Sequence, residues 1–543
     1  MAFSGNKPWL KKYAPGVRPH LEYPVVPLFR LLDDAVTAYP DRAAVIFAGN
    51  ELSYRKLGEM VDRLAAALVA LGVQKGDRVS VMLPNCPQLV AAYYGIIKAG
   101  AVVVQVNPMY MERELEYQLN NCGSEVMIIL DSFYPRLQNI KRKLPLKHVI
   151  TTGPSPGTGK VEGCLWLEEL LARNEPEPPV VPVAPGEDLA LLQYTGGTTG
   201  IAKGAMLTHF NLVANTMQTR EALAGLAGMG QETVLVALPL FHVYGMTIGM
   251  NLSVSLAATM VIMPRFEIDA VLRAINDYRP TLFPGAPTMY QAITGHPRVK
   301  EYNISSIKAC ISGSAPLPPE VARRFEELTG GRLVEGYGLT EASPVVTVNP
   351  LRGANKKGSI GQPLPDTDCV IVNLDTGTKE LSPGEIGELI VRGPQVMKGY
   401  WNMPEETANS LRDGWLYTGD VAKMDEEGYI YIVGRKKDMI IASGFNVYPR
   451  DVEEALYEHP KIAEAVVMGV SDLYRGESVK AFIVLKDGET ATEEEIIQYC
   501  RERLAAFKVP QFIEFREQLP KTIVGKILRR VLVEEERRKR SDG

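Results

Sequence analysis

Helical and strand-like segments alternate along more than half of this chain, and this alternation constrains the fold more than any other feature. Apolar residues recur at helical spacing in one set of segments and form short continuous runs in the other. The expected helices are residues 55–72, 87–99, 115–121, 211–223, 268–278 and 319–329, and the expected strands are residues 78–83, 101–106, 126–130, 189–192, 233–238, 281–283 and 307–312. Because strands joined by helical crossovers pair in parallel, the sequence predicts an α/β fold with parallel sheets.

The pattern changes after about residue 355. Short segments at 369–374, 388–391 and 429–433, separated by Gly, Pro and Asp turns, predict a β-rich subdomain. An α+β region follows, with helices expected at 449–459 and 493–507 and strands at 463–469 and 479–485. A chain of 543 residues is too long for one hydrophobic core. We therefore expect a large N-terminal domain over residues 1–434 and a small C-terminal domain over residues 435–543.

Composition excludes several classes of protein. Apolar residues make up 46% and charged residues 23% of the chain, as in an ordinary globular protein. A net charge of −5 gives no basis for nucleic acid as a partner. The six cysteines are scattered without a C-x-x-C pair, which argues against a zinc site or a disulfide framework and favours a reducing, cytoplasmic location.

Residues 243–263 carry no charge and are about as long as a bilayer crossing. They also contain Gly245, Gly249 and Asn251 and end in a β-like run. We interpret them as a buried helix followed by a core strand, and expect no transmembrane segment. Contact with the inner membrane face through Trp9, Lys11, Lys12 and Tyr13 is left open, as is a homodimer.

The glycine-rich segment from Tyr194 to Gly204, YTGGTTGIAKG, is the strongest functional signal. Its glycines let the backbone approach a ligand, its threonines supply hydroxyls, and Lys203 supplies a positive charge. It follows an apolar strand and precedes a helical pattern near Thr208, and such a turn suits an anionic phosphate. Ala202 and Gly204 on either side of the lysine distinguish it from a Walker loop. A flexible turn is the alternative for these residues alone.

Five later motifs complete a pattern: PLFHVYG (239–245), YGLTE (337–341), YTGD (417–420), GRKKDMI (434–440) and PKTIVGKILRR (520–530). In this order the chain resembles the AMP-forming acyl-CoA synthetases of the adenylate-forming superfamily. The block from Asp413 to Pro449 is most similar to bacterial long-chain fatty acid–CoA ligases. The resemblance covers essentially the whole chain. It implies a large adenylation domain, carrying the ATP and acyl sites, and a mobile C-terminal domain.

The resemblance implies a reaction in two steps with ATP, Mg²⁺ and coenzyme A. A fatty acid carboxylate attacks the α-phosphate of ATP, releasing pyrophosphate and leaving an acyl-adenylate, which the thiol of coenzyme A then attacks. Because a carboxylate is ionised at neutral pH, the first step needs positioning and charge neutralisation rather than a general base. Lys526 is expected to bridge the carboxylate and the α-phosphate, with Thr340 also reaching the α-phosphate. A solvated lysine is the alternative for Lys526.

The resemblance also assigns the nucleotide site. Glu341 is expected to ligate Mg²⁺ with the Thr195 hydroxyl, although it could be a helix-start carboxylate. Tyr337 is expected to stack on adenine, and Asp420 with Arg435 to bind the ribose; a core tyrosine and a turn aspartate are the alternatives. The β- and γ-phosphates would be held by Thr195, Gly196, Gly197, Thr198, Thr199, Gly200 and Lys203, and the remaining adenine and ribose residues would be Gly313, Ser314, Ala315, Glu335 and Gly336.

The C-terminal domain is expected to rotate between the two steps, because Lys526 and the pantetheine thiol need the same space. Lys437 occupies the family's hinge position, with a plain surface charge as the alternative. Ser443, Gly444 and Phe445 would line the coenzyme A tunnel.

The acyl pocket is expected to comprise His242, Val243, Tyr244, Gly245, Met246 and Gly249, with His242 as a positioning residue. This stretch has no cation for a second carboxylate, and His242 stands where amino-acid-activating relatives place an aspartate. A medium- or long-chain fatty acid suits the glycines and the adaptable Met246. A hydroxycinnamate is the alternative substrate, and a non-catalytic acyl- or nucleotide-binding protein is the alternative function. Ala202 and Gly434 depart from the family's commoner proline and aspartate without removing a catalytic group.

Overall fold

The computed structural model describes residues 3, 7–155, 157–195, 202–442, 445–472, 476–522 and 527–541. The chain forms two compact units. The large unit comprises residues 9–368 and 392–416, and the small unit comprises residues 1–8, 369–391 and 417–543. The β-rich segments after residue 369 therefore group with the C-terminal region. The boundary expected near residue 434 separates the large domain from the mobile C-terminal domain. A division by contacts does not test which segment moves, so this boundary stays a prediction.

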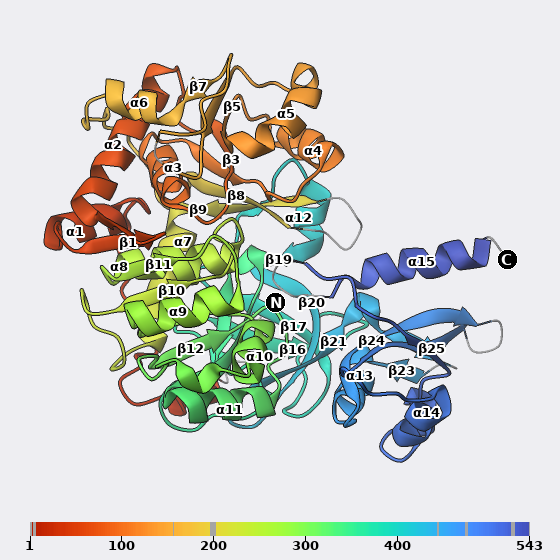
Figure 1. The fold of residues 1–543 in the computed structure, drawn as a ribbon. Helices are drawn as coiled ribbons and strands as arrows, with labels where there is room; N and C mark the ends of the chain where they lie inside the picture. Colours follow the sequence, from red (N-terminus) through yellow and green to blue (C-terminus); the bar gives the residue numbers. More distant parts are fainter. Residues whose placement is uncertain are drawn as a thin grey trace. The chain divides into compact units, whose positions relative to one another are not determined.

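The first sheet of the large unit has eight strands (Figure 1). Its order is β18 (Gly399–Tyr400), β9 (Lys203–Thr208), β8 (Leu189–Thr195), β4 (Val102–Gln105), β3 (Arg78–Met82), β5 (Val126–Leu130), β6 (His148–Thr152) and β7 (Leu165–Trp166). The strands from β8 to β7 run parallel. The middle strands are buried on both faces, which explains their continuous apolar runs.

The second sheet has two halves. One half has the order β2 (Asn50–Ser53), β1 (Ala43–Phe47), β11 (Thr259–Ile262) and β10 (Thr233–Val236), and the other, on the β10 side, has the order β12 (Ala309–Ser312), β13 (Arg332–Gly338), β14 (Val345–Val348) and β15 (Gln362–Pro363). The strand expected at 281–283 is reduced to single bridges from Leu282 to Val234 and Ala309. The segment is too short to form a ladder, but it joins the two halves of the sheet.

The predicted helices of the large unit are present, with ends that differ by a few residues. Ser53 caps α2 by accepting a hydrogen bond from the Lys56 amide, and Thr208 caps α7 by accepting one from the Asn211 amide. The helices are α1 (Arg30–Ala38), α2 (Tyr54–Ala70), α3 (Pro87–Lys98), α4 (Glu112–Cys122), α5 (Tyr134–Ile140), α6 (Leu167–Arg173), α7 (His209–Ala222), α8 (Leu252–Ser255), α9 (Ile268–Tyr278), α10 (Pro287–Gly295), α11 (Pro319–Thr329) and α12 (Pro404–Ser410).

The helix expected near Thr208 is confirmed as α7, but the glycine-rich segment was expected to be a strand-to-helix turn, and that part of the prediction was wrong. Residues 203–208 form β9, which pairs antiparallel with β8, and α7 begins only at His209. Apolar residues on alternate positions of β9 are buried, so the segment satisfies its backbone by extending the sheet. The glycine-rich segment therefore connects two antiparallel strands, and no helix N-terminus follows it directly.

The uncharged stretch 243–263 lies inside the large unit. It forms a π-helix over Gly245–Asn251, then α8 and β11, all of them buried. The interpretation as a buried helix and core strand is confirmed. Among the helices that the structure describes, none has the length and apolar character to cross a membrane.

The N-terminal residues considered for membrane contact are partly engaged within the large unit. Trp9 is only 2% exposed, and the Tyr13 hydroxyl donates a hydrogen bond to the Pro363 carbonyl at 2.8 Å. Trp9 is therefore buried in the protein, whereas Tyr13 is partly exposed, and contact with a membrane surface stays open. Lys11 and Lys12 are exposed.

The small unit contains two sheets. One is formed by β16 (Asp368–Val372), β17 (Gly387–Arg392) and β20 (Trp415–Met424), with β21 (Ile430–Arg435) paired to β20 and β19 (Leu411–Arg412) paired to Trp415 and Leu416. The other is formed by β23 (Phe445–Val447), β22 (Ile440–Ala442), β25 (Gly476–Leu485) and β24 (Ile462–Asp472), with β26 (Phe512–Phe515) paired to β25. The predicted β-rich and α+β regions are both present.

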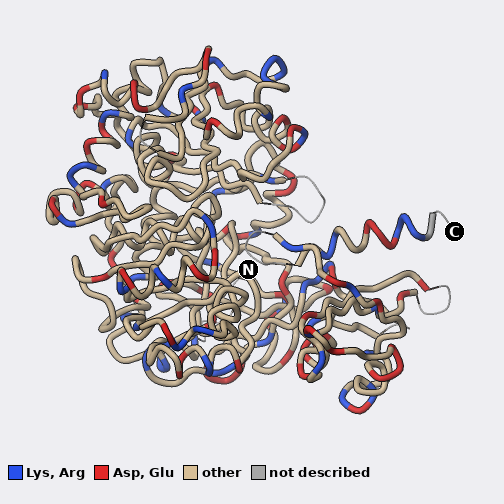
Figure 2. Tube along the Cα trace, viewed as in Figure 1, with Lys and Arg blue, Asp and Glu red and all other residues tan. Residues whose placement is uncertain are grey.

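The α-helices in the described part of the α+β region are α13 (Pro449–Tyr457), α14 (Glu493–Arg501) and α15 (Arg529–Ser541). α14 ends earlier than the helix expected over 493–507. α15 carries charges of both signs along its length (Figure 2). Its Leu532 is nevertheless buried beside Val466, Phe482 and Leu519, which fixes the helix to the sheet.

Candidate active site

The ends of the glycine-rich segment are fixed by the first sheet. Thr195 and Lys203 are register partners at the tips of β8 and β9, and residues 196–201 lie outside the described part of the chain. The Tyr194 hydroxyl donates to the Asn121 side-chain oxygen at 2.5 Å. A Cβ on Gly204 would come within 3.1 Å of the Tyr194 ring, so a larger residue would require the ring to shift. The segment therefore starts and ends at defined places, with Thr195 beside Lys203.

Lys203 is held by an acid and an aromatic ring. Its ammonium forms an ion pair with Glu406 of α12, and it lies over the ring of Tyr400, 5.3 Å from the ring centroid. The Lys203 side chain is 14% exposed, so its charge is largely shielded from water. An anion that binds this ammonium must compete with the Glu406 carboxylate.

Glu341 lies in a short 3-10 helix, Thr340–Ala342, directly after β13. The Tyr400 hydroxyl donates to its Oε1 at 2.6 Å, and the Met397 amide donates to its carbonyl oxygen at 2.8 Å. Burial, followed by the Glu341 charge, raises the pKa of Tyr400 well above its ordinary value, so the phenol stays protonated as a donor. Tyr400 therefore joins Glu341 to Lys203.

The donor set at Glu341 suits a magnesium ion that arrives with ATP. In the described ranges, no group of three or more His, Cys, Asp or Glu side chains could enclose a metal. Mg²⁺ is usually held by one or two carboxylates together with phosphate oxygens and water. A single carboxylate in a partly exposed position fits this pattern.

The expected adenine turn follows β12. Ser314 is exposed with φ of 74°, and the Glu335 carboxylate accepts a hydrogen bond from the Leu317 amide at 3.3 Å across the turn. β12 and β13 are adjacent parallel strands, so this turn and Tyr337 lie at the same end of the sheet. Tyr337 is partly exposed, which differs from an ordinary core tyrosine.

Close packing explains two further glycines of the expected adenine site. A Cβ on Gly336 would lie 3.0 Å from the Ile311 side chain, and one on Gly313 would lie 3.1 Å from the Tyr244 ring. The Tyr244 hydroxyl donates to the Ile311 carbonyl at 2.6 Å. Tyr244 was expected to line the acyl pocket, and it also supports the turn that follows β12.

The remaining residues of the expected acyl pocket lie at the start of the π-helix. The His242 Nδ1 accepts a hydrogen bond from the Tyr244 amide at 3.2 Å, so a neutral His242 carries its proton on Nε2. A Cβ on Gly245 would collide with the Pro239 carbonyl, and one on Gly249 would lie 3.3 Å from Val236. Val243 and Met246 are buried. The Thr247 hydroxyl donates to the Ser343 carbonyl at 2.7 Å, which ties this helix to the segment after Glu341.

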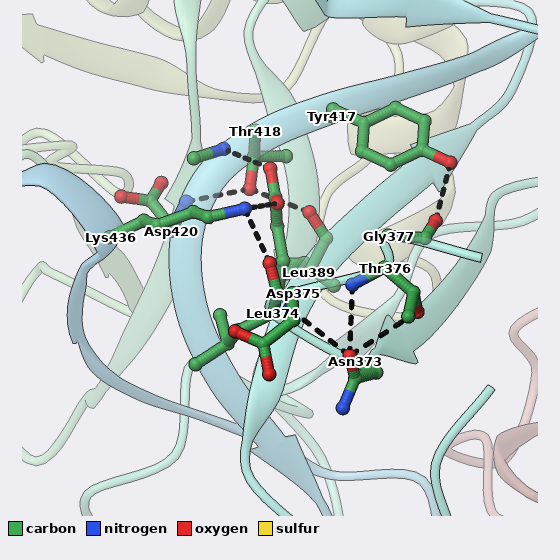
Figure 3. Close-up of polar contacts among 12 residues, drawn as sticks. Asn373, Leu374, Asp375, Thr376, Gly377, Leu389, Tyr417, Thr418, Asp420 and Lys436 are labelled. Carbon is green, nitrogen blue, oxygen red and sulfur yellow. Dashed lines mark hydrogen bonds and ion pairs between the residues drawn. The ribbon is translucent and has the colours of Figure 1, made fainter. Parts of the chain in front are cut away.

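In the small unit, the structure brings Asp420 and Arg435 together. They are register partners on β20 and β21, and the Arg435 Nε lies 2.9 Å from the Asp420 Oδ1. The turn before Asp420 is fixed by Thr418, whose hydroxyl donates to the Leu389 carbonyl at 2.7 Å and accepts from the Asp420 amide at 3.1 Å (Figure 3). Asp420 thus has a fixed direction and an arginine partner.

Glu388 holds the same turn from the other side. Its Oε1 accepts a hydrogen bond from the Gly419 amide at 3.1 Å, and its Oε2 lies 3.2 Å from the Lys436 ammonium. Glu388 is 5% exposed. Lys436 also donates to the Leu374 carbonyl at 2.8 Å (Figure 3). One buried carboxylate therefore connects the turn before Asp420 to the residue that precedes Lys437.

Lys437, the expected hinge residue, lies in a 3-10 helix after β21. Burial lowers its pKa, and the charges of Arg435 and Arg529 act in the same direction. Phe445 is 55% exposed and stacks on Phe507 with ring centroids 4.7 Å apart. The predicted residues Ser443, Gly444 and Lys526, like Gly196, Gly197, Thr198, Thr199 and Gly200, lie outside the described residues.

Sequence reasoning missed Tyr400, Glu406, Glu388 and Lys436. Tyr400 and Glu406 lie in the segment GYWNMPEE, which carries no charge cluster or glycine-rich signature. Tyr400 contacts Glu341, 59 positions away, and Glu406 contacts Lys203, 203 positions away. The only available signal was that Lys436 directly precedes the expected hinge.

Comparison with known proteins agrees with this geometry. Residues 32–401 match the family model of the AMP-binding enzymes, and residues 451–526 match the C-terminal domain of AMP-binding enzymes. The chain belongs to the AMP-binding enzyme family.

Three relatives place the chain within this family. A long-chain-fatty-acid–CoA ligase from Bacillus subtilis is 49% identical, covering 98% of both chains. A feruloyl-CoA synthase from an Amycolatopsis species is 39% identical over 90% of this chain and 95% of its own. The structure of ATP-bound MatB from Rhodopseudomonas palustris has a TM-score of 0.87 and 34% identity, covering 94% of this chain and 98% of its own.

Proposed function

We propose that this protein is an AMP-forming fatty acid–CoA ligase that acts on medium- to long-chain acids. The observation that carries the proposal is the arrangement around Tyr400, which joins Lys203 at the glycine-rich segment to Glu341 of the YGLTE motif. A cation and a carboxylate so placed suit the phosphates of ATP and their magnesium ion. The full-length likeness to the Bacillus subtilis ligase supports the same function.

The first step joins the fatty acid to AMP. A carboxylate oxygen attacks the α-phosphorus, the bond from that phosphorus to the bridging oxygen breaks, and pyrophosphate leaves. Thr195, residues 196–200 and Lys203 bind the β- and γ-phosphates, while Thr340 and Lys526 contact the α-phosphate. Glu341, with the Thr195 hydroxyl, holds Mg²⁺, which neutralises phosphate charge when bound. Gly313, Ser314, Ala315, Glu335, Gly336 and Tyr337 bind adenine, and Asp420 with Arg435 binds the ribose.

The second step transfers the acyl group. The sulfur of coenzyme A attacks the acyl carbon, the bond to the AMP oxygen breaks, and the thiol proton is lost as AMP leaves. Rotation of residues 435–543 about Lys437 removes Lys526 from the α-phosphate. The same rotation brings in a tunnel for pantetheine that includes Ser443, Gly444 and Phe445. These roles follow from the motifs that the chain shares with its family.

The acyl site favours an uncharged chain. Val243 and Met246 are buried and apolar, and His242 orients the acid. A hydroxycinnamate is the second candidate, since the feruloyl-CoA synthase is 39% identical to this chain. ATP, coenzyme A and the acid are the expected partners, and we place the protein in the cytoplasm.

The test is AMP release from ATP and Mg²⁺ with palmitate, octanoate or a hydroxycinnamate, each with and without coenzyme A. We expect AMP release that depends on coenzyme A with the two fatty acids. AMP release with the hydroxycinnamate alone would support the proposed two-step reaction but show that the substrate is an aromatic acid instead of a fatty acid. Protein that binds ATP but releases no AMP with any of the three acids would contradict the proposed ligase.

A further inference from the structure

Tyr400 is held rigidly at the edge of the first sheet. It pairs with Ala205 of β9, and its amide donates to the Thr407 hydroxyl at 2.9 Å. The preceding Gly399 has φ of 145°, and a Cβ there would lie 2.7 Å from the Thr407 methyl group. Tyr400 itself is 8% exposed. Its backbone and ring therefore have little freedom to move.

The two ends of the side chain have separate contacts. The hydroxyl donates to Glu341 at 2.6 Å, and the ring face lies 5.3 Å from the Lys203 ammonium. A hydrogen bond from a phenol restricts the orientation of the carboxylate that accepts it, and a ring beneath an ammonium attracts it without occupying its hydrogen-bond donors. The Tyr400 side chain thus restricts the orientation of the Glu341 carboxylate, the candidate metal ligand. It also restricts the position of the Lys203 ammonium, the candidate phosphate-binding group.

We propose that Tyr400 is a positioning residue for the metal and the phosphates: its hydroxyl orients Glu341 toward Mg²⁺, and its ring places Lys203 for ATP. The inference rests on the proposed function, because it takes Glu341 and Lys203 as groups that receive Mg²⁺ and ATP. It assigns Tyr400 no contact with the reacting atoms. The hydroxyl and the ring make different contributions, so they can be removed one at a time.

Three variants separate these contributions. Tyr400→Phe removes the hydroxyl and keeps the ring, and Tyr400→Leu removes both. Tyr117→Phe is the matched control, because the Tyr117 hydroxyl donates to the Ala202 carbonyl at 3.0 Å, close to the same segment, and has no contact with Glu341. It changes the same chemical group and leaves the proposed metal ligand unaffected.

The measurement is the calorimetric Kd for ATP, without fatty acid, in saturating Mg²⁺ and in EDTA. We expect Tyr400→Phe to reduce the gain in affinity that Mg²⁺ provides by about tenfold, because a hydrogen bond to a charged group is lost. Its Kd in EDTA should stay within about twofold of the wild type. Tyr400→Leu should also weaken binding in EDTA by about three- to tenfold, since the cation–π contact is lost. Tyr117→Phe should keep the wild-type gain.

Equal weakening of Tyr400→Phe with and without Mg²⁺, or no change in the Mg²⁺ gain, would overturn the inference. So would the same loss of the Mg²⁺ gain in Tyr117→Phe. Wild-type protein that shows the Mg²⁺ gain but forms no acyl-CoA from palmitate, octanoate or a hydroxycinnamate would contradict the proposed function and leave the role of Tyr400 intact. Circular dichroism of each variant establishes that it is folded.

Discussion

At the scale of single residues, the Lys203 ammonium that we propose for phosphate binding already forms an ion pair with Glu406. Phosphate oxygens must replace a carboxylate that already neutralises the ammonium. We predict that Glu406→Gln tightens ATP binding in EDTA by about two- to fivefold, consistent with about 0.5–1 kcal/mol for a partly exposed pair.

The neighbouring Glu405 provides the control for this prediction. Glu405→Gln changes the net charge equally, one position away on α12, while the ion pair with Lys203 is formed by Glu406. Isothermal titration should give it a Kd within about twofold of the wild type, since exposed charges are largely screened by salt. Equal tightening in both variants would indicate a general charge effect instead of competition at Lys203.

His209 gives a prediction about acid stability at the residue scale. It is 1% exposed, its Nδ1 accepts a hydrogen bond from the Leu28 amide at 3.1 Å, and burial lowers its pKa from 6.5 to about 4. In the unfolded chain, His209 therefore becomes protonated as the pH falls below about 6.5. In the folded chain, it stays neutral until about pH 4. The stability contributed by the neutral histidine is present above pH 6.5 and is lost as the pH falls through this window.

Replacing His209 by asparagine should flatten this pH dependence. The asparagine side-chain oxygen can accept the Leu28 amide proton without titrating. We expect the decrease in unfolding free energy between pH 7 and pH 5 to be smaller than in the wild type by about 1–2 kcal/mol. Urea unfolding followed by circular dichroism at both pH values measures it, and an unchanged slope would show that other groups cause the acid sensitivity.

At the scale of elements, the Glu388 carboxylate of β17 joins β20 to the 3-10 helix Lys436–Asp438 that follows β21. Removing its charge leaves Lys436 beside a neutral side chain and weakens the acceptor for the Gly419 amide. Because Lys436 is 45% exposed, we predict a destabilisation of only about 1–2 kcal/mol for Glu388→Gln. AMP should also bind several-fold more weakly, since the turn that carries Asp420 is loosened.

A double-mutant cycle with Lys436→Met tests this coupling. If loss of the ion pair causes the destabilisation, the double variant should be no less stable than Glu388→Gln alone. In the double variant both charges are removed, so no lysine is left without its counter-charge. Thermal unfolding and AMP titration measure the two consequences separately. Additive losses in the double variant would mean that Glu388 and Lys436 act independently.

Elements differed in how far the sequence could predict them. Long periodic segments such as α3 and α9 were predicted within one residue of their ends, because their apolar spacing is set locally. β9 was missed because its pairing with β8 is formed across a segment that was interpreted as one turn. Tyr400 and Glu406 could not be predicted, since their partners are brought to them only by the tertiary fold.

At the scale of the whole molecule, the residues that we propose to take part in the reaction belong to two different compact units. Glu341, Tyr337 and Lys203 belong to the large unit. Asp420, Arg435 and the motif that contains Lys526 belong to the small unit. If residues 435–543 rotate between the two reaction steps, a variant in that segment should separate the steps, whereas a variant at a nucleotide contact shared by both steps should not.

Lys526→Ala provides this test. Its ammonium is proposed to neutralise charge between the attacking carboxylate and the α-phosphate, so adenylation should slow by about 10²- to 10³-fold. The transfer step is proposed to place coenzyme A in that position, so thioester formation from chemically prepared palmitoyl-AMP should stay within about threefold of the wild type. Single-turnover assays of each step measure both rates. Asp420→Asn is the contrasting variant, because a weaker ribose contact should slow both steps together. Equal slowing of both steps by Lys526→Ala would contradict a rotation of residues 435–543 between them.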